Sequence, residues 1–219
     1  MILLTISIII SSISTPAGYT RVQTDGFGSF IRNYRLKEDK TVYLYNGKKK
    51  PNQNAQYAVL DIPVGTVDLQ QCADAVMRIR AEYLFSSRQY QKIVFYDNSN
   101  KPFRYEAPYS QGRLDNYLKL VFSRCNSASL EKQMKPVPIR NIRIGDVLIK
   151  GGFPGHVVIV VDMAINDKGE KIMMLAQSYM PAQDVHILKG PVAGVWYPLK
   201  EGVIDTPEYV FYSTQARTW

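Results

Sequence analysis

The stretch "GGFPGHVVIVVDM", residues 151–163, joins a glycine-rich turn to an apolar run that begins at His156, one of only two histidines in the chain. Valine and isoleucine dominate this run, which is typical of a buried strand. The turn sequence "NDKGE" follows at residues 166–170, and "KIMMLAQ" at residues 171–177 has the pattern of a second strand. We therefore predict an antiparallel hairpin at the centre of the fold, with an imidazole at the start of its first strand.

The first half of the chain has mainly helical patterns. The clearest helix covers residues 68–89, where Asp68 is a suitable N-cap and Gln71 stands three residues later, as in a capping box. A second helical pattern covers residues 112–134 and is predicted to break near Asn126. Shorter elements are predicted at residues 26–36 (a helix capped at Ser29), 41–53 (a strand that ends in an Asn-Gly turn) and 56–65 (a strand).

Strand patterns dominate after Pro136. They cover residues 142–150, 155–165, 171–180, 184–190, 194–199 and 208–213. Helices first and a mainly antiparallel sheet afterwards indicate an α+β fold. We expect it to form a single domain over residues 15–219. The second histidine, His186, is expected on an exposed or edge strand face.

The composition is that of an ordinary globular protein with an excess of positive charge. The net charge is +8 over 219 residues, but the basic residues are dispersed, so no nucleic-acid partner is expected. The one dense run, residues 48–50, is predicted to be a solvated hairpin tip. Because there is no CxxC motif and there are few histidines, neither a structural metal site nor a cofactor is expected. Cys72 and Cys125 lie in helical patterns and are expected to be free thiols.

The amino terminus resembles a short export signal. "MILLTISIII" at residues 1–10 is apolar but too short to span a bilayer as a helix, and "SSISTPAG" supplies the small residues of a cleavage site. We therefore assign residues 1–14 to an export signal and expect the protein in the periplasm or cell envelope, without a stable transmembrane span. The alternative is that these residues form the first strand of the fold.

Three side chains can form a nucleophilic site. A thiol attacks as the thiolate, and its pKa falls near a helix amino terminus or beside an imidazole. Cys72 lies in the first turn of the helix predicted at residues 68–89, and its backbone N–H is a candidate oxyanion donor. His156 is the candidate base, and Gln177, across the predicted hairpin, can accept the imidazole N–H and fix the tautomer. The alternative for Cys72 is an inert core thiol, and Cys125 is the less suitable nucleophile.

The pieces "IGDVLI", "GHVVIVV" and "LAQS" over residues 144–178, preceded by a helix-borne cysteine, resemble the NlpC-type and CHAP-type permuted papain-like cysteine peptidases. The resemblance implies a papain-like fold. It also implies a cysteine hydrolase or amidase that acts on peptide or amide bonds, such as those of a peptidoglycan-like substrate. The catalytic triad would consist of Cys72, His156 and Gln177. Candidate substrate contacts, with turn or core positions as the alternative, are Asn52, Gln53 and Tyr179.

Longer segments resemble an uncharacterised family of exported bacterial proteins, domain of unknown function 4846. They include "SFIRNYRL", "VLDIPVG", "DLQQCADAVMRIRAEYL" and "LAQSYMPAQDVHIL", and the resemblance extends from about residue 13 onward. It implies a bacterial envelope protein and brings no established activity. Two alternatives to an amidase therefore stay open: a non-catalytic envelope-binding protein on a papain-like scaffold, and an acyl-ester or thioester hydrolase or acyltransferase. The oligomeric state is also open.

Overall fold

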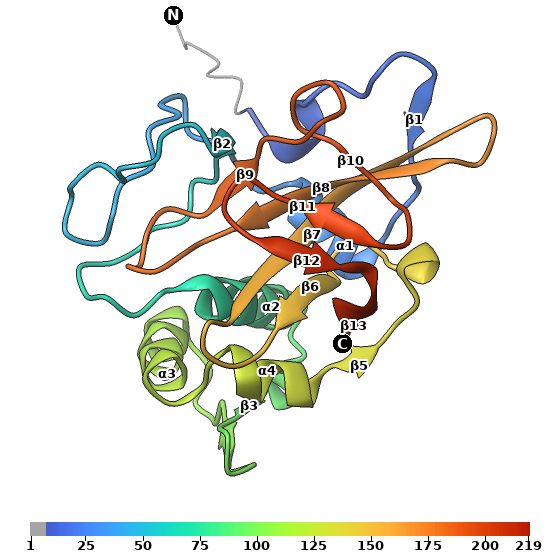
Figure 1. Cartoon of the computed structure of the whole chain (residues 1–219). Coiled ribbons are helices and arrows are strands. Elements are labelled where there is room, and N and C mark those ends of the chain that lie inside the picture. Colours follow the sequence, from blue (N-terminus) through green and yellow to red (C-terminus); the bar gives the residue numbers. More distant parts are fainter. Residues whose placement is uncertain (1–7) are drawn as a thin grey trace, which may run out of the picture.

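The computed structural model describes residues 8–219 and shows an α+β fold, in agreement with the predicted class (Figure 1). Residues 1–7, part of the predicted export signal, lie outside the described residues. The α-helices are α1 (Gly26–Arg32), α2 (Cys72–Ser86), α3 (Gln111–Arg124) and α4 (Ser127–Gln133). The 3-10 helices are η1 (Ile10–Ser12), η2 (Tyr90–Lys92), η3 (Ile139–Asn141) and η4 (Ser213–Gln215). The strands are β1 (Tyr19–Arg21), β2 (Gln56–Val59), β3 (Val94–Tyr96), β4 (Pro102–Arg104), β5 (Lys135–Pro136), β6 (Val147–Lys150), β7 (His156–Asn166), β8 (Lys171–Gln177), β9 (His186–Leu188), β10 (Tyr197–Pro198), β11 (Val203–Asp205), β12 (Val210–Tyr212) and β13 (Ala216–Thr218).

One large sheet organises the molecule, and β7 lies at its centre. Its strands pair antiparallel in the order β2-β9-β8-β7-β6-β13-β5, with β1 added to β7 and β10 added to β8. Strand β7 is 11 residues long, and all but its last two residues are buried, as its valine- and isoleucine-rich sequence predicts. In Figure 1, α1 lies behind this sheet and the small β11–β12 hairpin lies in front of it.

The β7–β8 hairpin turns at the "NDKGE" sequence, as predicted. Asn166 shapes the turn, because its side-chain oxygen accepts hydrogen bonds from two backbone N–H groups of the turn at 2.9 and 3.0 Å. The register pairs Ile159 of β7 with Ala176 of β8. It therefore brings the start of β7 beside the end of β8, where the predicted imidazole and amide lie.

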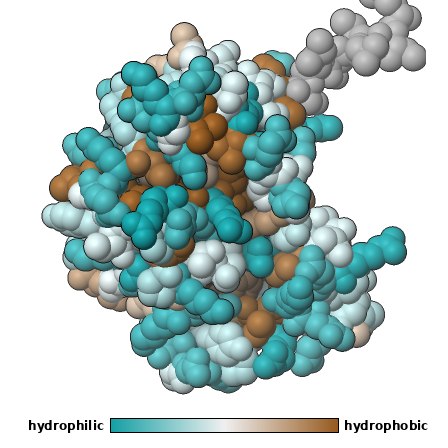
Figure 2. Space-filling model, turned by 90° about the vertical axis from the view of Figure 1, so that its right-hand side faces the viewer, coloured by the Kyte–Doolittle hydropathy of each residue, from teal (hydrophilic) through white to brown (hydrophobic). Residues whose placement is uncertain are grey.

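Helix α2 packs against β7 and β8, and its apolar side chains join one continuous core. Each fully buried valine, leucine or isoleucine side chain contributes about 1.5–3 kcal/mol to such a core. Figure 2 shows that one face of the molecule is mostly hydrophilic and that its apolar surface lies largely in hollows between polar side chains. The core thus forms where sheet and helix meet.

A buried ion cluster joins the amino-terminal segment to β7. Asp162 is fully buried within the apolar run, and both of its carboxylate oxygens are paired. Arg21 Nε lies 2.7 Å from one oxygen and Arg32 Nε lies 2.6 Å from the other. Because Arg21 belongs to β1 and Arg32 to α1, a single carboxylate holds both elements against the central strand.

The start of α2 corrects one prediction. The helix begins at Cys72, and its N-cap residue is Gln71, three residues after the predicted cap Asp68. The Asp68 carboxylate instead accepts from the backbone N–H of Ala182 at 2.7 Å and from the Gln71 side chain at 3.1 Å. Asp74 accepts from the Gln71 backbone N–H at 3.0 Å. A distant loop therefore engages the residue that local chemistry favours as the cap.

Two shorter elements also differ from prediction. Helix α1 is capped at Asp25, and the predicted cap Ser29 lies within it. Residues 41–53 form a loop with isolated bridges in place of a strand, although the Asn-Gly turn is present, with Gly47 at a φ of +78°. The predicted break near Asn126 is confirmed, because its side chain accepts from two N–H groups at the start of α4, at 3.0 and 3.1 Å. Both cysteines are free thiols, as predicted.

The described part of the predicted export signal packs against the fold. Ile9 bridges Arg35, and Ile10 is fully buried within η1. Ile13 also joins the core. Between residues 8 and 219, no helix has the length and apolar character needed to span a membrane.

We expect Asp162→Asn to lower the free energy of unfolding by about 3 kcal/mol, because it leaves two guanidinium groups beside a neutral amide in a buried site. Urea unfolding of both proteins measures the difference. The matched control is Asp167→Asn in the exposed turn of the same hairpin, where a change within about 0.5 kcal/mol is expected. Equal effects of the two substitutions would contradict a specific role of the buried cluster.

Candidate active site

His156 and Gln177 lie in contact at one end of the β7–β8 hairpin. His156 is the first residue of β7, Gln177 is the last residue of β8, and the imidazole Nε2 lies 2.7 Å from the amide Oε1. Both side chains are buried, with 1% of His156 and 2% of Gln177 exposed. Antiparallel pairing brings the start of one strand beside the end of the other, so the hairpin itself creates this contact.

The other side of Gln177 determines the direction of its amide. Its Nε2 donates to a carboxylate oxygen of Glu208 at 2.7 Å. A carboxylate only accepts, so the amide nitrogen faces Glu208 and the amide oxygen faces His156. The His156 Nε2 therefore carries the proton, and its Nδ1 keeps an unprotonated lone pair.

His186 is buried, and the prediction of an exposed or edge position is wrong. It lies in β9, which has β2 on one side and β8 on the other, and none of its surface is exposed. Its Nδ1 donates to the backbone oxygen of Asp184 at 2.9 Å, so its Nε2 is left to accept from the Gln177 amide at 3.2 Å. Burial lowers the pKa of His186, which keeps the ring neutral.

Glu208 comes from the turn between β11 and β12, and the loop at residues 46–53 holds it in place. Lys50 forms an ion pair with one carboxylate oxygen, and Asn52 Nδ2 donates to the other at 3.0 Å. Lys50 is only 6% exposed, so the prediction that residues 48–50 are a solvated tip is wrong for Lys50. The Glu208 carboxylate takes the place of water around the Lys50 ammonium group.

Three aromatic side chains cover the His156 ring. The ring centroid lies 4.6 Å from that of Tyr179, 5.1 Å from that of Tyr209 and 5.8 Å from that of Phe211. Two of these three side chains come from the β12 end of the β11–β12 hairpin. Burial lowers the pKa of His156 to about 4, so the ring is neutral at physiological pH.

Cys72 occupies the first position of α2, beside the start of β7. Burial has the largest effect on the pKa of its thiol, and the nearby backbone N–H groups of Val157, Ala73 and Cys72 itself oppose that effect. Val157 directly follows His156, so the sulfur and the imidazole come from adjoining parts of the structure. Burial raises the pKa of the thiol to about 11, and 7% of the residue is exposed. Within residues 8–219, no hydrogen bond joins the thiol to the imidazole.

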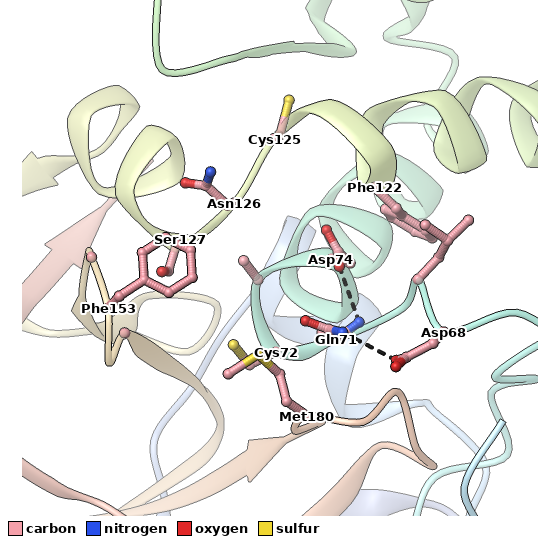
Figure 3. Close-up of a pocket in the computed structure, with 14 residues that line it drawn as sticks. Asp68, Gln71, Cys72, Asp74, Phe122, Cys125, Asn126, Ser127, Phe153 and Met180 are labelled. Carbon is pink, nitrogen blue, oxygen red and sulfur yellow. Dashed lines mark hydrogen bonds between the residues drawn. The ribbon is translucent and has the colours of Figure 1, made fainter.

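A pocket of about 150 Å³ opens beside Cys72 (Figure 3). In Figure 3, Cys72 and Met180 lie close together, while the sulfur of Cys125 points away from the other labelled side chains. His156 is not among the lining residues. The apolar part of the wall comes from Leu69, Phe122, Phe153 and Met180. The thiol is therefore the part of the predicted triad that a small ligand in this pocket can approach.

Asp74 contributes a buried carboxyl to the same pocket. One oxygen accepts from the Gln71 N–H at 3.0 Å, and the other has no hydrogen-bond partner among the described residues. Burial raises the pKa of Asp74 well above its ordinary value of 3.8. The side chain thus favours the neutral acid, which can donate a hydrogen bond into the pocket.

The three predicted substrate contacts occupy different places. Tyr179 lies against the His156 ring, and Asn52 binds Glu208. Gln53 closes its own loop, because its side chain bonds both the N–H and the carbonyl oxygen of Val42. None of the three lines the pocket beside Cys72. Among the described residues, no group of His, Cys, Asp and Glu side chains is arranged to hold a metal ion.

Three residues of the buried network belong to none of the motifs that predict the site: Lys50, His186 and Glu208. One signal was available for His186, because it lies between Val185 and Ile187 in an apolar strand that returns towards Gln177. The chain offers no comparable local signal for Lys50 and Glu208. Their contact joins segments 158 residues apart.

We expect Asp74→Asn to raise the free energy of unfolding at pH 7 by about 1 kcal/mol or more, because Asn does not ionise and each unit of pKa shift corresponds to about 1.4 kcal/mol. The folded-state pKa of Asp74 is raised, so its contribution to stability is full below pH 3.8 and is lost as the pH rises through the folded pKa. The gain should therefore vanish in acid. Urea unfolding across pH measures it, with the exposed Asp167→Asn as control. A loss of stability at pH 7 would contradict a neutral buried acid.

A family model described as Domain of unknown function (4846) matches the chain in two overlapping segments, residues 9–114 and residues 97–218. No curated protein and no solved structure matches the chain. The two segments together span nearly the whole sequence, including the helix of Cys72 and the hairpin of His156 and Gln177. The chain belongs to the family of domain of unknown function 4846.

Proposed function

We propose that this protein is a cysteine hydrolase with a papain-like fold that cleaves peptide or amide bonds. Cys72 is the nucleophile, His156 the general base and Gln177 the residue that orients the imidazole. The observation that carries the proposal is the 2.7 Å contact from His156 Nε2 to Gln177 Oε1, placed where the amino terminus of α2 meets the start of β7. This contact leaves Nδ1 as the only ring atom that can take a proton.

The chemistry follows from these positions. The sulfur of Cys72 attacks the carbonyl carbon of the substrate while its proton passes to Nδ1 of His156. The C–N bond then breaks, the proton moves from Nδ1 to the leaving amine, and a thioester remains. Water attacks the thioester and gives a proton to Nδ1, the C–S bond breaks, and the proton returns to the sulfur. Gln177 keeps the ring oriented throughout by accepting from Nε2–H.

The amino terminus of α2 provides charge stabilisation for the tetrahedral intermediate. The N–H groups of Cys72 and Ala73 lie in the first turn of α2, where a helix leaves its N–H groups without intrahelical partners, and they can donate to the oxyanion that forms on the carbonyl oxygen when the sulfur attacks. The pocket of about 150 Å³ beside Cys72 has room for a small acyl group. Its apolar wall and the neutral acid of Asp74 suit an uncharged acyl group that carries a hydrogen-bond acceptor.

The proposal places the protein in the periplasm or cell envelope, with a peptide or peptidoglycan-like substrate. The support is the export-signal pattern of residues 1–14 and the resemblance to NlpC-type and CHAP-type amidases. An apolar wall also admits an acyl ester or thioester. Substrates with the same acyl group and an amide, ester or thioester leaving group separate these activities.

One observation favours a second candidate function, a non-catalytic envelope-binding protein on the same scaffold. The imidazole is 1% exposed beneath Tyr179, Tyr209 and Phe211, and it does not line the pocket. A binding protein would keep this closed arrangement with its ligand bound. A hydrolase would label at Cys72 and turn over its substrate.

We expect an iodoacetamide probe to label Cys72 slowly at pH 7 and faster as the pH rises towards about 11, the pKa of the thiol. The thiolate fraction grows roughly tenfold per pH unit below that value. Cys72→Ala should abolish the label and leave thermal unfolding little changed. Cys125→Ala is the matched control and should keep the label, because burial raises the pKa of Cys125 to about 12. Label on Cys125 alone would rule out the proposed nucleophile.

We expect kcat/KM of any amide or thioester substrate to fall on the acid side only as the pH approaches about 4, the pKa of His156. Below that pH the ring holds its own proton and cannot act as a base. A panel of p-nitroanilide amides and short acyl thioesters supplies the substrates. His156→Ala should lower the rate by roughly 10³-fold or more. An acid limb near the ordinary value of 6.5 would contradict the lowered pKa of His156, and an unchanged rate in His156→Ala would show that another group is the base.

A further inference from the structure

The amide of Gln177 can in principle lie in either of two directions. With its oxygen towards His156, it accepts from Nε2–H and leaves Nδ1 free to act as a base. With its nitrogen there, it would require an unprotonated Nε2, and the proton would move to Nδ1. The direction of this one amide therefore decides which ring nitrogen can take a proton.

Two acceptors on the far side of Gln177 select the first direction. Glu208 Oε2 accepts from the amide nitrogen at 2.7 Å, and His186 Nε2 lies 3.2 Å from the same nitrogen. His186 depends on Asp184, whose backbone oxygen accepts from Nδ1. The Nε2 of His186 can present a lone pair or a proton, depending on the tautomer of the ring. An ionised Glu208 carboxylate can only accept, so it defines the direction of the amide.

Several contacts keep Glu208 ionised and fixed. Burial alone would raise the pKa of Glu208, but its polar contacts, including the ion pair with Lys50, outweigh burial and lower the pKa to about 2. Lys50 pairs with the oxygen that faces Gln177, and Asn52 donates to the other oxygen at 3.0 Å. The carboxylate is thus held on both oxygens from a separate loop.

We propose that Glu208 is a positioning residue, which holds the Gln177 amide in the direction that puts the proton of His156 on Nε2 and leaves Nδ1 as the base. Its importance for turnover rests on the proposed function. The tautomer itself is a property of the folded protein and can be measured without a substrate. Lys50 and Asn52 support the role by holding Glu208.

The chain has only two histidines, so ¹⁵N NMR of the labelled full-length protein reports both rings without overlap. The wild-type protein should show His156 protonated on Nε2 and His186 protonated on Nδ1, which are opposite tautomers. Glu208→Ala should lose the single tautomer of His156 and show a mixture. Glu208→Gln offers one acceptor oxygen and should restore the Nε2–H form. Substitution of a residue with a purely structural role would not change the tautomer of His156 and restore it in this way.

The matched control is Glu201→Ala, which removes a carboxylate at the other end of the same hairpin, where it accepts from Ser213. It should leave both tautomers unchanged. Should Glu208→Ala fail to fold, the double variant Lys50→Met, Glu208→Met takes its place, because replacing both members of a buried ion pair by apolar side chains is often neutral for stability. It should also show mixed tautomers.

Two results would overturn the positioning role: Nδ1–H on His156 in the wild-type protein, or an unchanged single tautomer in the folded variant without Glu208. Failure of the proposed function gives a different pattern. In that case Glu208→Ala alters the tautomer as described, while no amide, ester or thioester is cleaved by the wild-type protein. The tautomer of His156 therefore tests the positioning role of Glu208, and turnover of a substrate tests the proposed hydrolase function.

Discussion

The amide of Gln177 is the group on which the buried polar end of this fold depends. It has one acceptor oxygen and one donor nitrogen, and the structure commits the oxygen to His156 and the nitrogen to Glu208 and His186. Buried polar groups must find partners, since an unpaired one costs about 1–3 kcal/mol. Moving any one of Gln177, His156, His186 and Glu208 therefore leaves a partner without its hydrogen bond. The positions of the two rings and the carboxylate thus depend on one another.

The same requirement connects segments that the strand ladder does not hold together. Lys50 lies in a loop and Glu208 in a hairpin turn outside the large sheet, yet their ion pair is mostly buried, with 6% and 12% of the side chains exposed. Breaking a buried pair by removal of one partner is strongly destabilising, because it leaves an uncompensated charge. The pair thereby fixes the β11–β12 hairpin over His156 and brings Tyr209 and Phe211 onto its ring.

Sequence reasoning succeeded where the deciding interactions are local. The "NDKGE" turn predicts the β7–β8 hairpin and thus the meeting of His156 with Gln177, and Asn126 predicts the break between α3 and α4. It failed where a distant segment supplies the partner. Asp68 has the chemistry of an N-cap but binds the loop at Ala182. The apolar neighbours of His186 indicate burial, but they do not identify β2 and β8 as the strands that cover it. Periodicity reports burial on a nearby face and carries no information about such tertiary contacts.

The two pKa shifts at the proposed triad share one cause, which constrains how it can work. Burial raises the pKa of Cys72 to about 11 and lowers the pKa of His156 to about 4, so both groups rest in their neutral forms. A preformed thiolate–imidazolium pair needs the opposite shifts. In the proposed hydrolase, proton transfer from sulfur to Nδ1 therefore has to accompany attack on the carbonyl. It also requires the imidazole of His156 to come within reach of the Cys72 sulfur.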